Sequence, residues 1–185
     1  MPANVSDAAG NAASEVTSTA FTVNSSLPTI AAIETSAFSW GAVLNATEDN
    51  SNGTVTVTTT GVDDGQTLTI VLNGANYTGS VSSNSVTVTI SAAGLQALTD
   101  GQSYTMTANV SDADGNAAAE VTSSSFSVDT SIPSVLLVSS NVANSSYVAG
   151  DIIPIYILFD DDVTVSGTPQ LTLETGSSDA VVDYS

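Results

Sequence analysis

The chain contains short runs in which apolar and polar residues alternate, a pattern typical of half-buried β-strands. Val and Thr alternate over residues 54–60, and the same period returns over residues 67–72 and 85–90. Asn73-Gly74 directly follows the second run, and this dipeptide predicts a two-residue hairpin turn before Tyr77. The pattern therefore predicts antiparallel strands joined by tight turns.

The remaining elements complete a sandwich of about seven strands. Residues 30–33 form the expected opening strand, and residues 92–98 resemble one helical turn that crosses between two sheets. Residues 102–110 and 119–128 form the expected last hairpin, around the turn Asp112-Ala113-Asp114-Gly115-Asn116. Asp100-Gly101-x-x-Tyr104 lies where a tyrosine corner would fall, with a buried ring and one hydroxyl hydrogen bond. The expected fold class is all-β, an immunoglobulin-like sandwich.

A long internal repeat sets the domain organisation. Residues 3–13 recur as residues 108–118, and the match continues to Pro28 and Pro133, which lie 105 positions apart. A period of that length fits a whole small domain, so an elongated array of tandem domains is expected. We expect residues 1–28 to be the C-terminal strand or strands of a preceding repeat and residues 29–133 to be one complete repeat. Residues 134–185 then begin a different β-sandwich repeat, with strands over residues 134–140, 151–159, 170–175 and 180–184.

Composition limits the chemistry, because the 185 residues include no Lys, Arg, His or Cys, against 19 Asp and Glu. Cationic side chains bind nucleic acid and anionic membrane surfaces, so a chain of formal charge −19 disfavours both partners. The usual general bases and nucleophiles are absent, and oxygen atoms alone remain as metal ligands, which favours calcium or magnesium. No apolar run approaches the ~20 residues of a membrane-spanning helix, so no direct membrane insertion is expected.

Carboxylates gather at both ends of the predicted sandwich. The last hairpin lies beside the incoming chain and the loop after the second strand, whereas the outgoing linker lies at the opposite end. Like charges at abutting ends repel unless a divalent cation bridges them, so calcium is the expected structural, inter-domain cofactor. An Asp-Gly hairpin turn explains the 112–116 sequence equally well without a metal. The candidate ligands are Asp112, Asp114, Asn116, Asp63 and Asp64 at one end, and Asp129, Asp100, Glu48 and Asp49 at the other.

Three other function classes compete with a structural role. Glycoside hydrolysis needs two carboxylates some 5–10 Å apart, and no pair lies in a cleft-forming segment, so no enzyme is expected. A carbohydrate-binding module needs exposed aromatics, whereas Trp40 and Phe38 are better interpreted as core or junction packing. Strand donation would give head-to-tail self-association, since residues 1–28 supply closing-strand sequence that residues 134–185 lack.

Several motifs have counterparts in a known family. They are residues 110–117 (Val-Ser-Asp-Ala-x-Gly-Asn-Ala), Asp129-Thr130-x-x-Pro133, Leu44-Asn45-Ala46-x-Glu48, and residues 61–68 (Gly-Val-x-Asp-Gly-Gln-Thr-Leu) with Leu72-Asn73-Gly74. These motifs resemble the bacterial immunoglobulin-like repeats of giant RTX-type adhesins and biofilm-associated surface proteins. Residues 149–184 are similar to a second repeat type found in the same kind of protein.

The resemblance implies a secreted, calcium-stiffened extender that spaces a ligand-binding tip from the bacterial cell surface in adhesion and biofilm formation. Its partners would be neighbouring repeats of the same polypeptide, outside the cell. The alternatives are a β-sandwich module that binds carbohydrate or another surface ligand, and a subunit of an extracellular filament assembled by strand donation. The chain departs from the family pattern at Asn24, where the second linker has Asp129, and at Ala9, where the second copy has Asp114. The two junctions are therefore expected to differ in metal binding.

Overall fold

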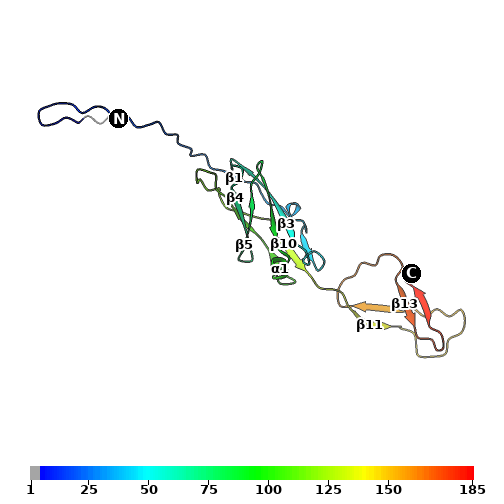
Figure 1. The fold of residues 1–185 in the computed structure, drawn as a ribbon. Coiled ribbons are helices and arrows are strands. Elements are labelled where there is room, and N and C mark those ends of the chain that lie inside the picture. The colour runs from blue at the N-terminus through cyan, green and yellow to red at the C-terminus, as the bar shows by residue number, and fades with distance from the viewer. Residues whose placement is uncertain (1–4) are drawn as a thin grey trace. The chain divides into compact units, whose positions relative to one another are not determined.

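The computed structural model describes residues 5–185, and the chain divides into two units, Met1–Asp129 and Thr130–Ser185 (Figure 1). Residues 1–4, which include Ala3 and Asn4 at the start of the repeat match, lie outside the described residues. A complete β-sandwich occupies the part of the first unit that follows Pro28. We refer to residues 28–129 as the sandwich.

The first sheet of the sandwich contains the Val/Thr alternation. Its strands are ordered β1-β3-β6 and all neighbours are antiparallel. Val55 and Val57 are buried, whereas Thr56 and Thr58, which alternate with them, are exposed, which is the outcome that a period of two predicts. The strands predicted over residues 54–60 and 85–90 are confirmed in this sheet, and the strand predicted over residues 67–72 is confirmed in the second layer. The bounds are β1 (Thr29–Ile30), β3 (Gly53–Thr60) and β6 (Ser85–Ile90).

The second layer contains the predicted last hairpin, divided into two sets of hydrogen-bonded strands. Their orders are β5-β4-β8-β9 and β2-β10-β7, and β2 pairs in parallel with β10. Ser123 interrupts the hairpin, because its hydroxyl oxygen accepts from the backbone N–H of Met106 at 2.9 Å. Sequence reasoning missed β2. The bounds are β2 (Val43–Asn45), β4 (Thr67–Leu72), β5 (Ala75–Ser80), β7 (Ser103–Tyr104), β8 (Thr107–Asn109), β9 (Val121–Thr122) and β10 (Phe126–Asp129).

The connections follow the expected local chemistry. Asn73 and Gly74 have φ values of 48° and 78°, the left-handed pair that a type I′ hairpin turn requires between β4 and β5. The predicted helical turn is α1 (Ala92–Gln96), and the Ser91 hydroxyl caps it by accepting from the Gly94 N–H at 3.2 Å. A short 3-10 helix, η1 (Thr35–Ala37), connects the first strand to the core aromatic residues.

The core is built around an aromatic cluster. Trp40 is 5% exposed and stacks on Phe38, with ring centroids 5.4 Å apart, and both rings contact Phe126. A Cβ at Gly53 would lie 2.5 Å from Cζ3 of Trp40, so this strand position needs glycine. The Tyr104 hydroxyl accepts from the Thr99 backbone N–H at 2.9 Å, which confirms the hydrogen bond of the predicted tyrosine corner, whereas the ring is half-buried rather than buried. The core interpretation of Trp40 and Phe38 is therefore correct.

The segments outside the sandwich contain little buried apolar surface. Residues 5–13 form a turn whose Ser6–Ala12 bridge matches the Ser111–Ala117 bridge of the second copy. Val16 and Phe21, which correspond to Val121 and Phe126 in the sandwich, are 86% and 82% exposed. The second unit contains two hairpins, each strand of which lies within an expected segment. They are β11 (Val135–Ser139) with β12 (Tyr156–Phe159), and β13 (Gln170–Leu173) with β14 (Ala180–Asp183).

Candidate functional site

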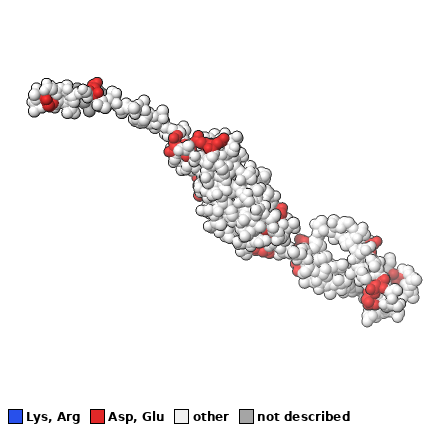
Figure 2. All heavy atoms as spheres, viewed as in Figure 1, with Lys and Arg blue, Asp and Glu red and all other residues white. Residues whose placement is uncertain are grey.

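The chain enters the sandwich at one end and leaves it at the other. Thr29 pairs with Thr60 at the end of β3, whereas Asp129 pairs with Asn45, which precedes the turn that leads into the start of β3. We call the first the entry end, formed by Pro28 and the loops of residues 61–65, 82–84 and 111–117. The second is the exit end, formed by the loops of residues 46–52 and 91–102 together with Asp129. Figure 2 shows acidic residues toward both ends of the sandwich, with few on the flank between them.

Asp112 organises the 111–117 loop at the entry end. It is 5% exposed, and its two carboxylate oxygens accept from the backbone N–H and the side-chain Nδ2 of Asn116 at 2.7 and 2.8 Å. These donors favour the ionised carboxylate, so the hydrogen bond from the Asn116 side chain lowers the pKa of Asp112 below its ordinary value. Asp112 and Asn116 therefore serve the hairpin turn.

The first copy of this loop has the same hydrogen bonds. Oδ1 and Oδ2 of Asp7 accept from the backbone and side-chain nitrogens of Asn11, each at 2.9 Å, and the side-chain bond again lowers the pKa of the aspartate. Residues 5–13 have no surrounding sandwich, and their loop residues are exposed. The hydrogen bonding is thus a property of the local sequence Asp-x-x-Gly-Asn.

The other predicted ligands at the entry end also accept hydrogen bonds. Oδ2 of Asp63 accepts from the Ala113 N–H at 3.0 Å, which ties the 61–65 loop to the 111–117 loop. Oδ1 of Asp64 accepts from the Ser83 N–H at 2.7 Å. Asp114 accepts from the side chain of Asn24 at 2.7 Å, a contact that sequence reasoning missed. The structure thus brings these loops together, and N–H donors occupy one oxygen of each of these three carboxylates.

The exit end holds the other four candidates. Oε2 of Glu48 accepts from the Asn45 N–H at 3.1 Å, and Asp49 lies in the same turn, where its own N–H donates to the Asn45 carbonyl. The Gly101 N–H donates to the Val128 carbonyl at 2.9 Å, which places the turn that contains Asp100 beside the end of β10 and hence beside Asp129. The four carboxylates therefore occupy neighbouring loops at one end.

Calcium suits this donor chemistry, because hard oxygens are the ligands it prefers. Within residues 5–185, however, no three carboxylates lie close enough together to hold a metal ion. At the entry end the oxygens of Asp112, Asp63, Asp64 and Asp114 accept hydrogen bonds that stabilise loop structure. At the exit end the carboxylates share an end without forming a ligand group.

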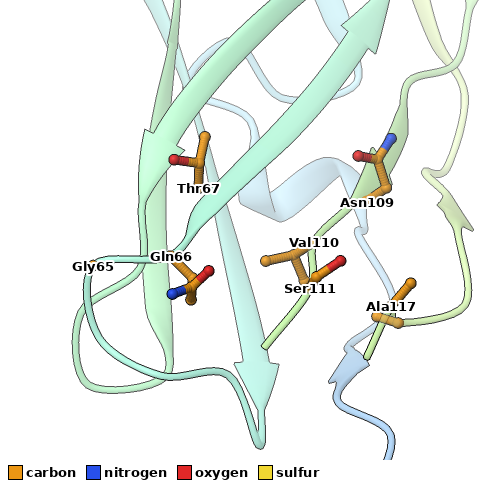
Figure 3. Close-up of a pocket in the computed structure, with 8 residues that line it drawn as sticks. Gly65, Gln66, Thr67, Asn109, Val110, Ser111 and Ala117 are labelled. Atoms are coloured by element: carbon orange, nitrogen blue, oxygen red, sulfur yellow. The ribbon is translucent and has the colours of Figure 1, made fainter. Parts of the chain in front are cut away.

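Two cavities mark the surface of the sandwich, and neither contains a carboxylate pair. The larger, of about 340 Å³, lies where Gln66 leads into β4 at Thr67 and where Val110 and Ser111 follow the end of β8 at Asn109 (Figure 3). The smaller, of about 210 Å³, contains one carboxylate, Glu48.

Three of the solved structures that are similar to the chain come from adhesins that bind ice. The first comes from a 1.5-MDa bacterial ice-binding adhesin and gives insight into the retention of that adhesin on the host cell surface. It is 26% identical, with a TM-score of 0.42 over 69% of this chain and 40% of that one. A Ca²⁺-stabilised adhesin that helps an Antarctic bacterium reach out and bind ice is 26% identical, with a TM-score of 0.54 over 98% of this chain and 44% of that one. No protein-family model matches the chain, and no curated protein matches it.

The third similar structure is a bacterial immunoglobulin-like domain of the M. primoryensis ice-binding adhesin. It is 30% identical over 96% of its own length and 56% of this chain, with a TM-score of 0.39. The chain belongs to the bacterial immunoglobulin-like repeats of adhesins. Membership confirms the resemblance that the motifs predict and the all-β, tandem immunoglobulin-like architecture. The chain spans less than half of each of the two larger adhesin structures.

The three similar structures described above all come from adhesins. No helix among the described residues is long and apolar enough to cross a membrane. The candidate features of this repeat are therefore its two acidic ends and the linkers that adjoin them.

Proposed function

We propose that the chain is an extender segment of a secreted bacterial adhesin, which spaces a ligand-binding tip from the cell surface. The observation that carries the proposal is the position of the chain ends on the sandwich. The chain enters beside Thr60 and leaves beside Asn45, so domains joined in series add their full length to the array. At about 3.3 Å per residue, the eight residues of β3 alone contribute about 26 Å.

The similarity to the adhesin that helps a bacterium reach out and bind ice supports this role. A passive spacer needs a stable core and compatible ends, and it needs no ligand cavity. The buried aromatic cluster agrees with the need for a stable core. A surface location outside the cell follows from the same role, because an extender acts between the cell and its target.

An in-frame deletion of residues 29–133 from the intact protein tests the proposal directly. Removing one repeat of 105 residues should shorten the reach of the adhesin by one domain length while ligand binding at the tip persists. Atomic force microscopy on single molecules measures the reach, and attachment assays measure the binding. Loss of attachment with unchanged reach would show that the repeat binds the ligand itself.

The exit end is the proposed place of calcium binding. We infer that Asp129, with Asp100, Glu48 and Asp49, contributes to calcium binding that stiffens the following junction. The carboxylates of neighbouring loops repel one another in a chain without cationic side chains, and a divalent cation relieves that repulsion. Replacement Asp129→Asn removes one full charge and should weaken calcium binding in calorimetric titration without unfolding the sandwich. Unchanged affinity would assign Asp129 to the linker alone.

A further inference from the structure

The linker that precedes the sandwich is attached to it through the side chain of Asn24. Nδ2 of Asn24 donates to Oδ2 of Asp114 at 2.7 Å. Oδ1 of the same amide accepts from the backbone N–H of Ser26 at 3.1 Å, which closes a turn within the linker. The amide is thus oriented at both atoms, and its donor group is directed at the 111–117 loop.

The other end of the linker contacts a second loop. Pro28 is buried, and its Cα lies 3.6 Å from the position that a Cβ at Gly61 would occupy. The 61–65 loop is in turn joined to the 111–117 loop, because Asp63 accepts from the Ala113 N–H at 3.0 Å. The linker and the two loops therefore form a closed circuit of contacts, in which Asn24 and Pro28 are the two attachments of the linker.

The charge of the entry end makes the amide at position 24 significant. Asp63, Asp64, Asp112 and Asp114 all lie in its loops, and the chain has no Lys, Arg or His to compensate them. An amide can donate to the Asp114 carboxylate, whereas an aspartate at the same place would set two like charges in contact. The corresponding residue of the next linker is the aspartate Asp129.

We propose that Asn24 is a positioning residue that holds residues 24–28 on the sandwich without a metal. The residue at this point of each linker then selects how the junction is stiffened: asparagine by a hydrogen bond to the next domain, and aspartate by a divalent cation. The comparison with Asp129 rests on the proposed function, whereas the hydrogen-bonded clasp between Asn24 and Asp114 does not.

Backbone ¹⁵N relaxation on the full chain measures the order of Ser25, Ser26 and Leu27 in EDTA and in calcium. In the wild-type chain these order parameters should be close to the rigid value of about 0.85 in both conditions. In Asn24→Asp they should fall below about 0.6 in EDTA and rise again when calcium is added. The double variant Asn24→Asp with Asp114→Asn reverses donor and acceptor, so it should restore the order in EDTA.

Asn76→Asp is the matched control, because it adds the same charge at an exposed position on β5, and it should leave the linker ordered in EDTA. The proposal is overturned if the Asn24→Asp linker stays ordered in EDTA, if calcium fails to restore its order, or if the swapped pair leaves it disordered. A wild-type linker that loosens in EDTA overturns it as well. The order of residues 129–133, read from the same spectra, reports separately on calcium at the exit end.

Discussion

At the residue scale, the side chain of Trp40 distinguishes a structural domain from a sugar-binding module. A sugar platform needs an exposed ring, whereas Trp40 is 5% exposed and packs against Phe38 and Phe126. Trp40→Ala should therefore lower the free energy of unfolding by about 3–5 kcal/mol, the cost of a large aromatic truncation in a core. Chemical denaturation monitored by circular dichroism measures this change.

Two further variants sharpen that result. Trp40→Phe keeps an aromatic ring and removes an indole N–H that has no acceptor among the described residues, so it should cost less than the alanine variant. Tyr184→Ala removes a 62% exposed ring and should change stability little. A Trp40→Ala chain of unchanged stability that had lost binding on a glycan array would refute the core role.

Asp112 gives the sandwich an acid-sensitive contribution to stability. Hydrogen bonds from Asn116 hold the pKa of Asp112 below its ordinary value of 3.8 in the folded state. A depressed folded pKa means that this stability is fully present above the unfolded pKa and is lost as the pH falls through the folded pKa. The melting-temperature difference between the wild type and Asp112→Asn should thus be largest near neutral pH.

The same difference should shrink below about pH 4, as the wild-type carboxyl group takes up its proton. Calorimetric scans of both proteins from neutral to acidic pH measure it. Comparing the two proteins at each pH cancels the relief of charge repulsion that acidification brings to the whole chain. A difference that grows toward acidic pH would contradict the assigned role of the Asn116 hydrogen bonds.

At the element scale, the last hairpin depends on the hydroxyl group of Ser123. This side chain is 6% exposed and replaces a strand-to-strand contact, because its oxygen accepts from the Met106 N–H where β7 gives way to β8. Ser123→Ala leaves that buried N–H without an acceptor, so it should cost about 1–3 kcal/mol. Equilibrium urea unfolding checks the value, with the exposed Ser125→Ala as control. Equal effects of the two substitutions would refute the role.

The elements that sequence predicted best are those that carry their own periodic signal. Val/Thr alternation located β3 and β6, and Asn73-Gly74 located the turn after β4. The strand β2 has three residues and pairs in parallel with β10, so its existence depends on tertiary pairing that no local pattern records. The break in the last hairpin likewise depends on one buried hydroxyl group.

The candidate site was predictable in position and less so in chemistry. Loop topology correctly grouped Asp63 with the 112–116 turn, since antiparallel connections alternate between the two ends of a sandwich. The partners of those carboxylates could not be read from composition, because an Asp-rich turn serves a metal or a backbone N–H equally well. The difference between Asn24 and Asp129 was visible in the repeat, but the contact between Asn24 and Asp114 required the fold.

At the scale of the whole molecule, the main long-range interaction is the mutual repulsion of the carboxylates that give the chain its formal charge of −19. Screening shortens the Debye length from about 10 Å at 0.1 M salt to about 3 Å at 1 M, so any cation relieves the repulsion between acidic ends. A bound calcium ion would act differently, because it joins particular carboxylates at concentrations too low to screen the rest. Measurements at matched ionic strength distinguish the two effects.

Small-angle X-ray scattering of the intact protein that carries this segment, in calcium and in EDTA at matched ionic strength, tests the extender account most directly. The account predicts a rod-like particle in calcium and a more flexible one, with a changed maximum dimension, in EDTA. The Asp129→Asn variant should retain more of that flexibility in calcium than the wild type does. A maximum dimension and flexibility that are identical in calcium and EDTA would contradict calcium-dependent stiffening.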